Sequence, residues 1–202
     1  MNIRYYKIFV LLIALFLSGC ASFPPITPKG LWDATEVGEI RGKLMVEWYS
    51  PDKFIYRPDP NDPLRFIRKK EGIVIDTITP GNMLTDGGSI PRVLWFQRGY
   101  SPWTYGPAYI IHDWLFELKH CNFPGSEKYN HLVAAEIMAE VMKTQIISEK
   151  GKVDYYFKHM NLINNWTQIY NAVRVGSGGL WKKGQCEAFT PKNMQEQPAN
   201  KQ

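Results

Sequence analysis

A chain of 202 residues is the length of one domain, and its hydrophobic content of 45% is sufficient for a substantial core. The net charge of +5 comes from 24 basic and 19 acidic side chains, and two of the basic ones lie in an N-terminal segment that we expect to be removed. This near balance of basic and acidic side chains argues against nucleic-acid binding, which requires a strongly basic surface.

The first 19 residues have the layout of a signal peptide. Arg4 and Lys7 precede an apolar run at residues 8–17, which has the size of a signal sequence and is too short to span a bilayer. The run ends in Leu-Ser-Gly-Cys at residues 17–20, which resembles the cleavage box of bacterial lipoproteins. We therefore expect Cys20 to be lipidated and to anchor the mature chain by its acyl chains.

The residues after the cysteine suggest where the chain is anchored. Ala21 resembles the outer-membrane sorting class, so the expected location is the periplasmic face of the outer membrane. Residues 20–37 are assigned to the lipidated cysteine and an extended, Pro-rich tether. Residues 38–184 are assigned to a single domain, and residues 185–202 to a polar tail.

The first half of the domain reads as β-strands. Four β-rich runs, at residues 39–49, 53–57, 64–69 and 73–78, are separated by segments rich in Pro, Asp and Gly. Short strands joined by turns of this kind predict an antiparallel meander.

The second half has helical periodicity. One helix is predicted over residues 108–118, a second from Ser126 as its N-cap to about Lys150, and a third over about residues 153–175. Apolar residues fall on one face of the second helix (Leu132, Ala135, Ala139, Met142, Ile146) and of the third (Tyr156, Met160, Ile163, Tyr170, Val173). Strands followed by helices predict an α+β fold, with a small antiparallel sheet followed by about three packed α-helices.

Two cysteines remain once Cys20 is lipidated, namely Cys121 and Cys186. Export would place them in an oxidising compartment, so we predict a disulfide between them. The alternative is two separate thiols, one buried and one exposed near the tail.

Two motifs carry polar side chains suited to chemistry: Thr-Asp-Gly-Gly-Ser-Ile-Pro at residues 85–91, and His112-Asp113 in the first predicted helix. An aromatic cluster lies in and after the first motif (Trp95, Phe96, Tyr100, Trp103, Tyr105, Tyr109). Such a cluster either covers the core or presents a binding surface.

These motifs resemble a family known as domain of unknown function 1353, which is widespread in phages and prophages. Its pattern is T-D-G-A-S-I-P with a following Trp, then H-D with Leu and an aromatic, an A-D pair, and a late Y-x-A-V-R-x-x-G. The matching segments here are residues 85–95, 112–116, 135–136 and 170–176, with Gly88 for the usual Ala and Glu136 for the usual Asp. The resemblance covers roughly residues 38–181 and implies a fold and a prophage setting, without an activity.

Asp86, His112, Asp113 and Glu136 are the candidate polar or catalytic centre. The first three would suit a divalent cation such as zinc or manganese, with Glu136 as general base, and the sequence indicates no other cofactor. Metal-dependent phosphohydrolases that use adjacent His and Asp need a further His upstream, and this chain has none before His112.

Each of these residues also has a structural interpretation. Asp86 could bond the backbone amides of its own turn, and His112 could be a core histidine that pairs with Asp86. Asp113 and Glu136 could pair with Arg92, Arg98 or Arg174, or Glu136 could lie on a solvated face.

Two functions are therefore considered. The first is a prophage-derived, lipid-anchored envelope protein that acts without catalysis, as a binding or accessory protein for an envelope or phage protein. The second is a metal-dependent hydrolase of an envelope polymer such as peptidoglycan. A dry, paired His112-Asp86 contact would favour the first, and three of the four side chains converging within ligand distance in an open cleft would favour the second.

Overall fold

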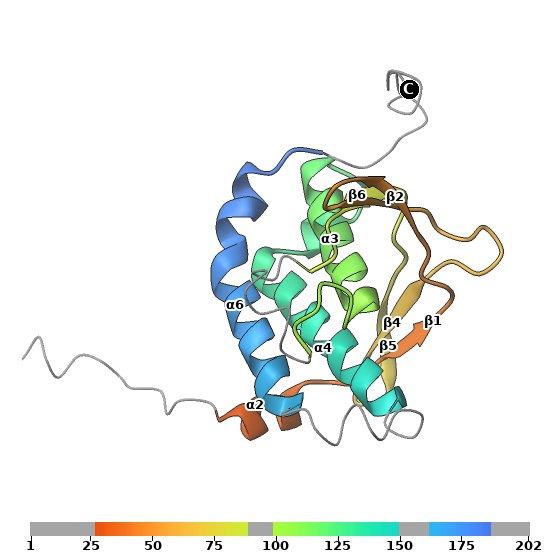
Figure 1. Ribbon diagram of the computed structural model, residues 1–202. Helices are drawn as coiled ribbons and strands as arrows, with labels where there is room; N and C mark the ends of the chain where they lie inside the picture. The colour runs from red at the N-terminus through yellow and green to blue at the C-terminus, as the bar shows by residue number, and fades with distance from the viewer. Residues whose placement is uncertain (1–26, 89–98, 150–161, 187–202) are drawn as a thin grey trace, which may run out of the picture.

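Two small β-sheets and a layer of helices make up the described part of the chain, which in this computed structural model comprises residues 27–88, 99–149 and 162–186 (Figure 1). One antiparallel sheet has the order β1-β4-β5, from β1 (Glu39–Arg41), β4 (Arg65–Lys70) and β5 (Ile73–Ile78). The other has the order β2-β3-β6, from β2 (Val46–Ser50), β3 (Lys53–Tyr56) and β6 (Met83–Thr85). The α+β prediction is confirmed, but the expected single meander is wrong.

The predicted first strand is divided at Gly42. This glycine has φ +84°, and a Cβ there would lie 2.0 Å from the carbonyl oxygen of Pro63. Only glycine tolerates this conformation and this close approach. The chain therefore leaves the first sheet after β1 and enters the second as β2. Strand β6 was not predicted, since three residues show no periodicity.

The helices are α2 (Pro28–Ala34), α3 (Gly106–His120), α4 (His131–Glu149) and α6 (Leu162–Lys183). Ser126 does not cap α4 as predicted, because it opens a separate 3-10 turn, η2 (Ser126–Lys128). The cap of α4 is Asn130, whose side-chain oxygen accepts from the amides of Leu132 and Val133 at 2.9 and 3.0 Å. Helix α6 continues past the predicted end near Val175, and the predicted segment before Leu162 lies outside the described residues.

Helix α4 packs between α3, α6 and the first sheet. Four residues of its predicted face are buried (Ala135, Ala139, Met142 and Ile146), whereas Leu132 in the first turn is 39% exposed and was wrongly assigned to the core. On α6, Trp166 is fully buried and its indole N–H donates to the carbonyl of Ala139 at 2.9 Å. Tyr170 is buried as predicted, and Tyr156 and Met160 lie outside the described residues.

Residues 28–37 are part of the fold and not part of an extended tether. The Trp32 ring packs edge-on against Trp166 at 5.3 Å, and the buried ammonium group of Lys143 donates to the carbonyls of Trp32 and Thr35 at 2.6 Å each. These contacts bind α2 to α4 and α6. Residues 20–26 of the predicted tether lie outside the described residues.

The predicted disulfide is confirmed. Cys121 follows the last turn of α3, and it is bonded to Cys186, which follows α6. The bond joins the C-terminal ends of two helices that run in the same direction (Figure 1). Residues 185 and 186, which we assigned to the tail, therefore belong to the domain. In the described part of the chain, no helix combines the length and the apolar character needed to cross a bilayer.

Candidate functional site

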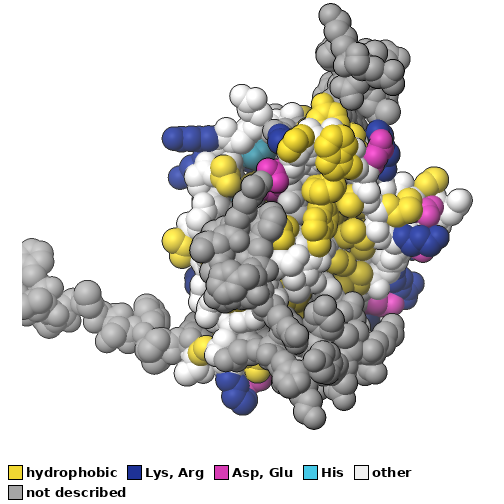
Figure 2. All heavy atoms as spheres, in the orientation of Figure 1, with side chains coloured by type: hydrophobic (Ala, Val, Ile, Leu, Met, Phe, Trp, Pro, Cys, Tyr) yellow, Lys and Arg dark blue, Asp and Glu magenta, His cyan; other side chains and the backbone are white. Residues whose placement is uncertain are grey.

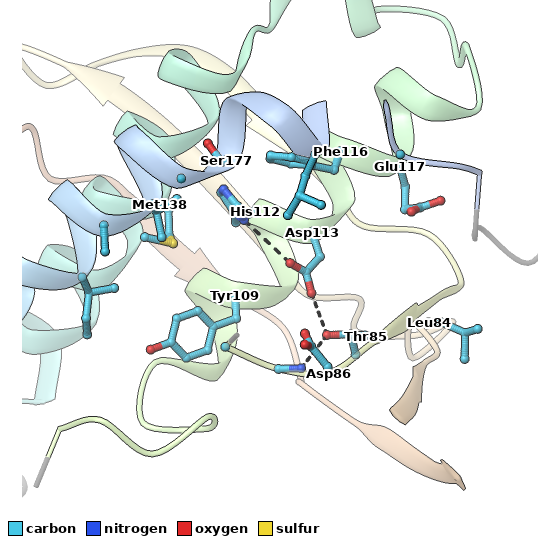
Figure 3. Close-up of a pocket in the computed structure, with 18 of the residues that line it drawn as sticks. Leu84, Thr85, Asp86, Tyr109, His112, Asp113, Phe116, Glu117, Met138 and Ser177 are labelled. Atoms are coloured by element: carbon cyan, nitrogen blue, oxygen red, sulfur yellow. Dashed lines mark hydrogen bonds and ion pairs between the residues drawn. The ribbon is translucent and has the colours of Figure 1, made fainter. Parts of the chain in front are cut away.

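A cavity of about 690 Å³ lies between α3, α6 and the turn after β6 (Figure 3). Its walls are mainly apolar, with Phe116 from α3, Met138 from α4, and Ile169, Val173 and Leu180 from α6. Thr85, Asp86, His112, Asp113 and Ser177 are among the polar residues that line it.

The turn after β6 is held by Thr85. The Thr85 hydroxyl donates to Oδ2 of Asp113 at 2.7 Å and accepts from the amide of Gly87 at 2.9 Å. Gly87 has φ +77°, and a Cβ there would lie 2.8 Å from the carbonyl oxygen of Pro102. The sequence interpretation overlooked Thr85, although a threonine that bonds the amide two residues later is a known turn former.

Asp86 is exposed and lines the cavity, together with His112 and Asp113. Glu136 is not brought to this group, because it is exposed on α4 and does not line the cavity. It follows the buried Ala135, and neighbouring residues on a helix point about 100° apart. Of the alternative partners Arg92, Arg98 and Arg174, the first two lie outside the described residues. Among the described residues, no ion pair joins Arg174 to Asp113 or Glu136.

The imidazole of His112 is mostly buried, with a side chain that is 13% exposed. Its Nδ1 lies 3.7 Å from Oδ1 of Asp113, and its ring packs on Phe116 with 4.8 Å between centroids. The His112-Asp86 contact considered above is thus replaced, at Nδ1, by a neighbour on the same helix.

Three polar atoms of this cavity are buried and have no hydrogen-bond partner among the described residues: His112 Nε2, Tyr109 OH and Ser177 Oγ. Leaving a buried polar group unpaired costs about 1–3 kcal/mol, so such groups are few in folded proteins. Burial also raises the pKa of Tyr109 far above its usual value, which keeps the phenol neutral. Water or a bound molecule would supply the hydrogen-bond partners of these three atoms.

The suggested metal site requires Asp86, His112 and Asp113 to offer ligand atoms to one point. Across residues 27–88, 99–149 and 162–186, one trio of His, Cys, Asp or Glu side chains has ligand atoms within 4.8 Å of one another, and it is Glu117, Cys121 and Cys186. The sulfurs of that trio are bonded to each other. Asp86, His112 and Asp113 do not bring their ligand atoms together in this way, and they therefore do not fit a divalent cation in this arrangement.

The aromatic cluster divides between the two roles considered for it. Tyr105 is 1% exposed and belongs to the core, and Trp103 packs edge-on against Phe54 at 5.0 Å. Tyr100 and Tyr109 are buried and also line the cavity. Trp95 and Phe96 lie outside the described residues.

Fold and site together define an α+β protein with a ligand-sized, largely apolar cavity between two parallel helices. Residues 61–156 match the model of a family described as a protein of unknown function (DUF1353). The matched segment includes Thr85, His112 and Asp113, and it supports the resemblance drawn from the motifs, whereas α6 lies beyond it. Neither a curated protein nor a solved structure matches the chain.

Proposed function

We propose that this protein is a lipid-anchored envelope protein that binds a molecule with a large apolar part in the cavity between α3 and α6. The observation that carries the proposal is a cavity of about 690 Å³ with mainly apolar walls and three buried polar atoms that have no partner among the described residues. Small-molecule sites typically have such a volume and a few polar groups that orient the ligand.

One hydrogen bond and one disulfide hold the walls of the cavity in place. The Thr85-Asp113 hydrogen bond fixes the turn to α3, and the Cys121-Cys186 disulfide fixes the end of α3 to that of α6. A site that is already ordered loses little conformational freedom when it binds, which favours affinity.

The location is supported by other features. The box that ends at Cys20 supports lipid anchoring at the outer membrane, and a disulfide suits an exported protein. The phage setting of the resembled family supports a prophage origin.

Figure 2 shows hydrophobic side chains gathered in a band on one face, over the region of β2, β6 and α3. Such a surface suits an envelope or phage protein as partner.

The metal-dependent hydrolase is the less favoured function. Its three ligands do not converge, and its general base, Glu136, lies outside the cavity. We expect a strong chelator to leave ligand binding unchanged.

Photoaffinity labelling tests the binding proposal. The full-length protein in lipid nanodiscs is incubated with a neutral alkyl diazirine probe, irradiated and mapped by mass spectrometry. Adducts should lie on α3 and α6 along the cavity, and Val173→Trp, which fills the cavity, should abolish them. The matched control is Val175→Trp on the same helix, where the native side chain is 86% exposed. Adducts that are unaffected by Val173→Trp would overturn the proposal.

A further inference from the structure

The two ring nitrogens of His112 face different surroundings. Nδ1 is turned toward the carboxylate of Asp113, at 3.7 Å from Oδ1, while Nε2 is buried at the cavity without a partner among the described residues. In a neutral imidazole, a proton on the nitrogen that faces a carboxylate leaves a lone pair on the other nitrogen. Nε2 is then the basic atom of the cavity.

Ser177 lies on α6 at the same level as His112. The rings of Phe116 on α3 and Trp181 on α6 are in contact, with centroids 4.8 Å apart. His112 and Ser177 each precede these residues by four positions, which is one helical turn on the same face. Because the two helices run in the same direction, this pair lies one turn before the ring contact, and Figure 3 shows both side chains at the cavity. Oγ of Ser177 and Nε2 of His112 are not hydrogen-bonded to each other in this structure.

The hydroxyl of Ser177 differs from the buried threonine hydroxyls on the described helices. Thr144 and Thr167 donate to the carbonyl four residues earlier, at 2.7 and 2.6 Å. Ser177 is only 6% exposed, yet its Oγ has no such bond and no other partner in the described part of the chain. A helical serine commonly bonds its hydroxyl in this way, so the unbonded hydroxyl of this cavity-lining residue keeps its hydrogen-bonding capacity for a ligand.

Glycines surround this serine within the helix. Gly176 lines the cavity, and at both Gly176 and Gly179 a Cβ would meet no atom within 4 Å. Glycine within a helix costs about 1 kcal/mol relative to alanine. At Gly176, which lines the cavity, the missing side chain keeps the wall beside Ser177 open.

We propose that Ser177, His112 and Asp113 act as nucleophile, general base and orienting carboxylate in the hydrolysis of a carboxylic ester. The inference rests on the proposed function, because the acyl chain of the ester occupies the same apolar cavity. Thr85 holds the carboxylate of Asp113 in place through its 2.7 Å hydrogen bond. Covalent acyl transfer generally uses a nucleophile, a base and a group that orients the base, and the bond from Oγ of Ser177 to Nε2 of His112 would form when the ester binds.

The reaction balances with water as the second reactant. Oγ of Ser177 forms a bond to the carbonyl carbon while Nε2 of His112 accepts the hydroxyl proton. The tetrahedral intermediate collapses, the alcohol departs with that proton, and an acyl-serine ester remains. Water then attacks the acyl carbon, His112 takes its proton and returns it to Oγ, and the carboxylic acid is released.

The lining indicates an uncharged ester. Phe116, Ile169 and Val173 are suited to an aliphatic or aromatic acyl group. An apolar lining of this kind favours an uncharged ester with a hydrophobic acyl group.

A covalent probe tests the nucleophile. The full-length protein in nanodiscs is treated with an alkyl fluorophosphonate, and the adduct is mapped by mass spectrometry. One adduct is expected, on Ser177, with none in Ser177→Ala and with labelling slowed by about 100-fold or more in His112→Ala. Ser148→Ala is the matched control, since Ser148 is exposed on α4 and its hydroxyl donates to the carbonyl of Gln145. Hydrolysis of p-nitrophenyl esters of increasing chain length should follow the same pattern.

A second variant separates reactivity from folding. In Ser177→Cys, the thiol should react with iodoacetamide at least ten times faster than in the double variant Ser177→Cys/His112→Ala. Equal rates, or fluorophosphonate labelling that persists in Ser177→Ala, would overturn the inference. If the diazirine probe enters the cavity while Ser177 stays unlabelled, the esterase inference fails and the binding proposal stands. If the diazirine probe does not enter, both fail.

Discussion

The hydroxyl of Thr85 and the carboxylate of Asp113 are joined by a hydrogen bond of 2.7 Å, which connects the turn after β6 to helix α3. The same hydroxyl accepts from the amide of Gly87, so one buried side chain organises the turn and holds the carboxylate beside His112. The wall of the cavity therefore depends on a residue with no direct part in the proposed chemistry.

Thr85→Val should destabilise the protein by about 1–3 kcal/mol, because it leaves Asp113 and the Gly87 amide without their partner. Thr85→Ser keeps the hydroxyl and should lose less. Urea denaturation followed by circular dichroism measures both. Equal stability of Thr85→Val and the native protein would show that water replaces the hydroxyl.

The buried pair of Arg68 and Glu140 should be far more sensitive than a surface pair. Two hydrogen bonds of 2.8 Å join the guanidinium to the carboxylate, with side chains 19% and 9% exposed. Glu140→Gln leaves Arg68 without its counter-charge and should cost about 3 kcal/mol. The matched control is Glu47→Gln, which breaks the exposed Arg57-Glu47 pair and should cost less than about 1 kcal/mol. Similar losses in the two variants, measured by urea denaturation, would contradict this assignment.

Stability should fall above about pH 10 through the buried tyrosines. Burial raises the pKa of Tyr105 to about 12, while the unfolded chain titrates near 10. Between these values the unfolded chain loses a proton that the folded protein retains, so the free energy of unfolding decreases as pH rises. Urea denaturation at pH 9 and pH 11 measures the effect, and Tyr105→Phe should make it smaller. The same pH dependence in Tyr105→Phe would refute the assignment to this side chain.

Reduction of the Cys121-Cys186 disulfide should destabilise the protein by about 4 kcal/mol in the chain-entropy model, since the closed loop spans 65 residues. Differential scanning calorimetry with and without reductant measures this loss. In the oxidised protein with Cys20 replaced by Ser, thiol counting under denaturing conditions should find no free thiol. Two reactive thiols there would exclude the bond in solution.

Cys20→Ser should abolish acyl labelling in cells and leave the protein unprocessed or unanchored, because the thiol is the acceptor in the predicted cleavage box. Metabolic labelling with an alkynyl fatty acid and membrane fractionation provide the readout. Unchanged mass and membrane association in this variant would reject the lipid anchor.

Local signals in the sequence determined the α+β class, the position of α3, most of the buried face of α4 and the two motifs at the cavity. Helical period, turn-forming residues and cysteine number are local or countable properties, so a single sequence reveals them. The approximate ranges of the three predicted strands from residue 53 onward follow from the same kind of signal.

Only the tertiary structure decided which strands share a sheet and which polar side chains share a site. The close approach of Gly42 to Pro63 separates β1 from β2, and that contact joins segments distant in sequence. Glu136 has the residue type expected of a catalytic base but is exposed and does not line the cavity, whereas Ser177, a single serine among glycines, does. A serine carries no recognisable signal by itself, because its neighbours depend on how α3 and α6 pack side by side.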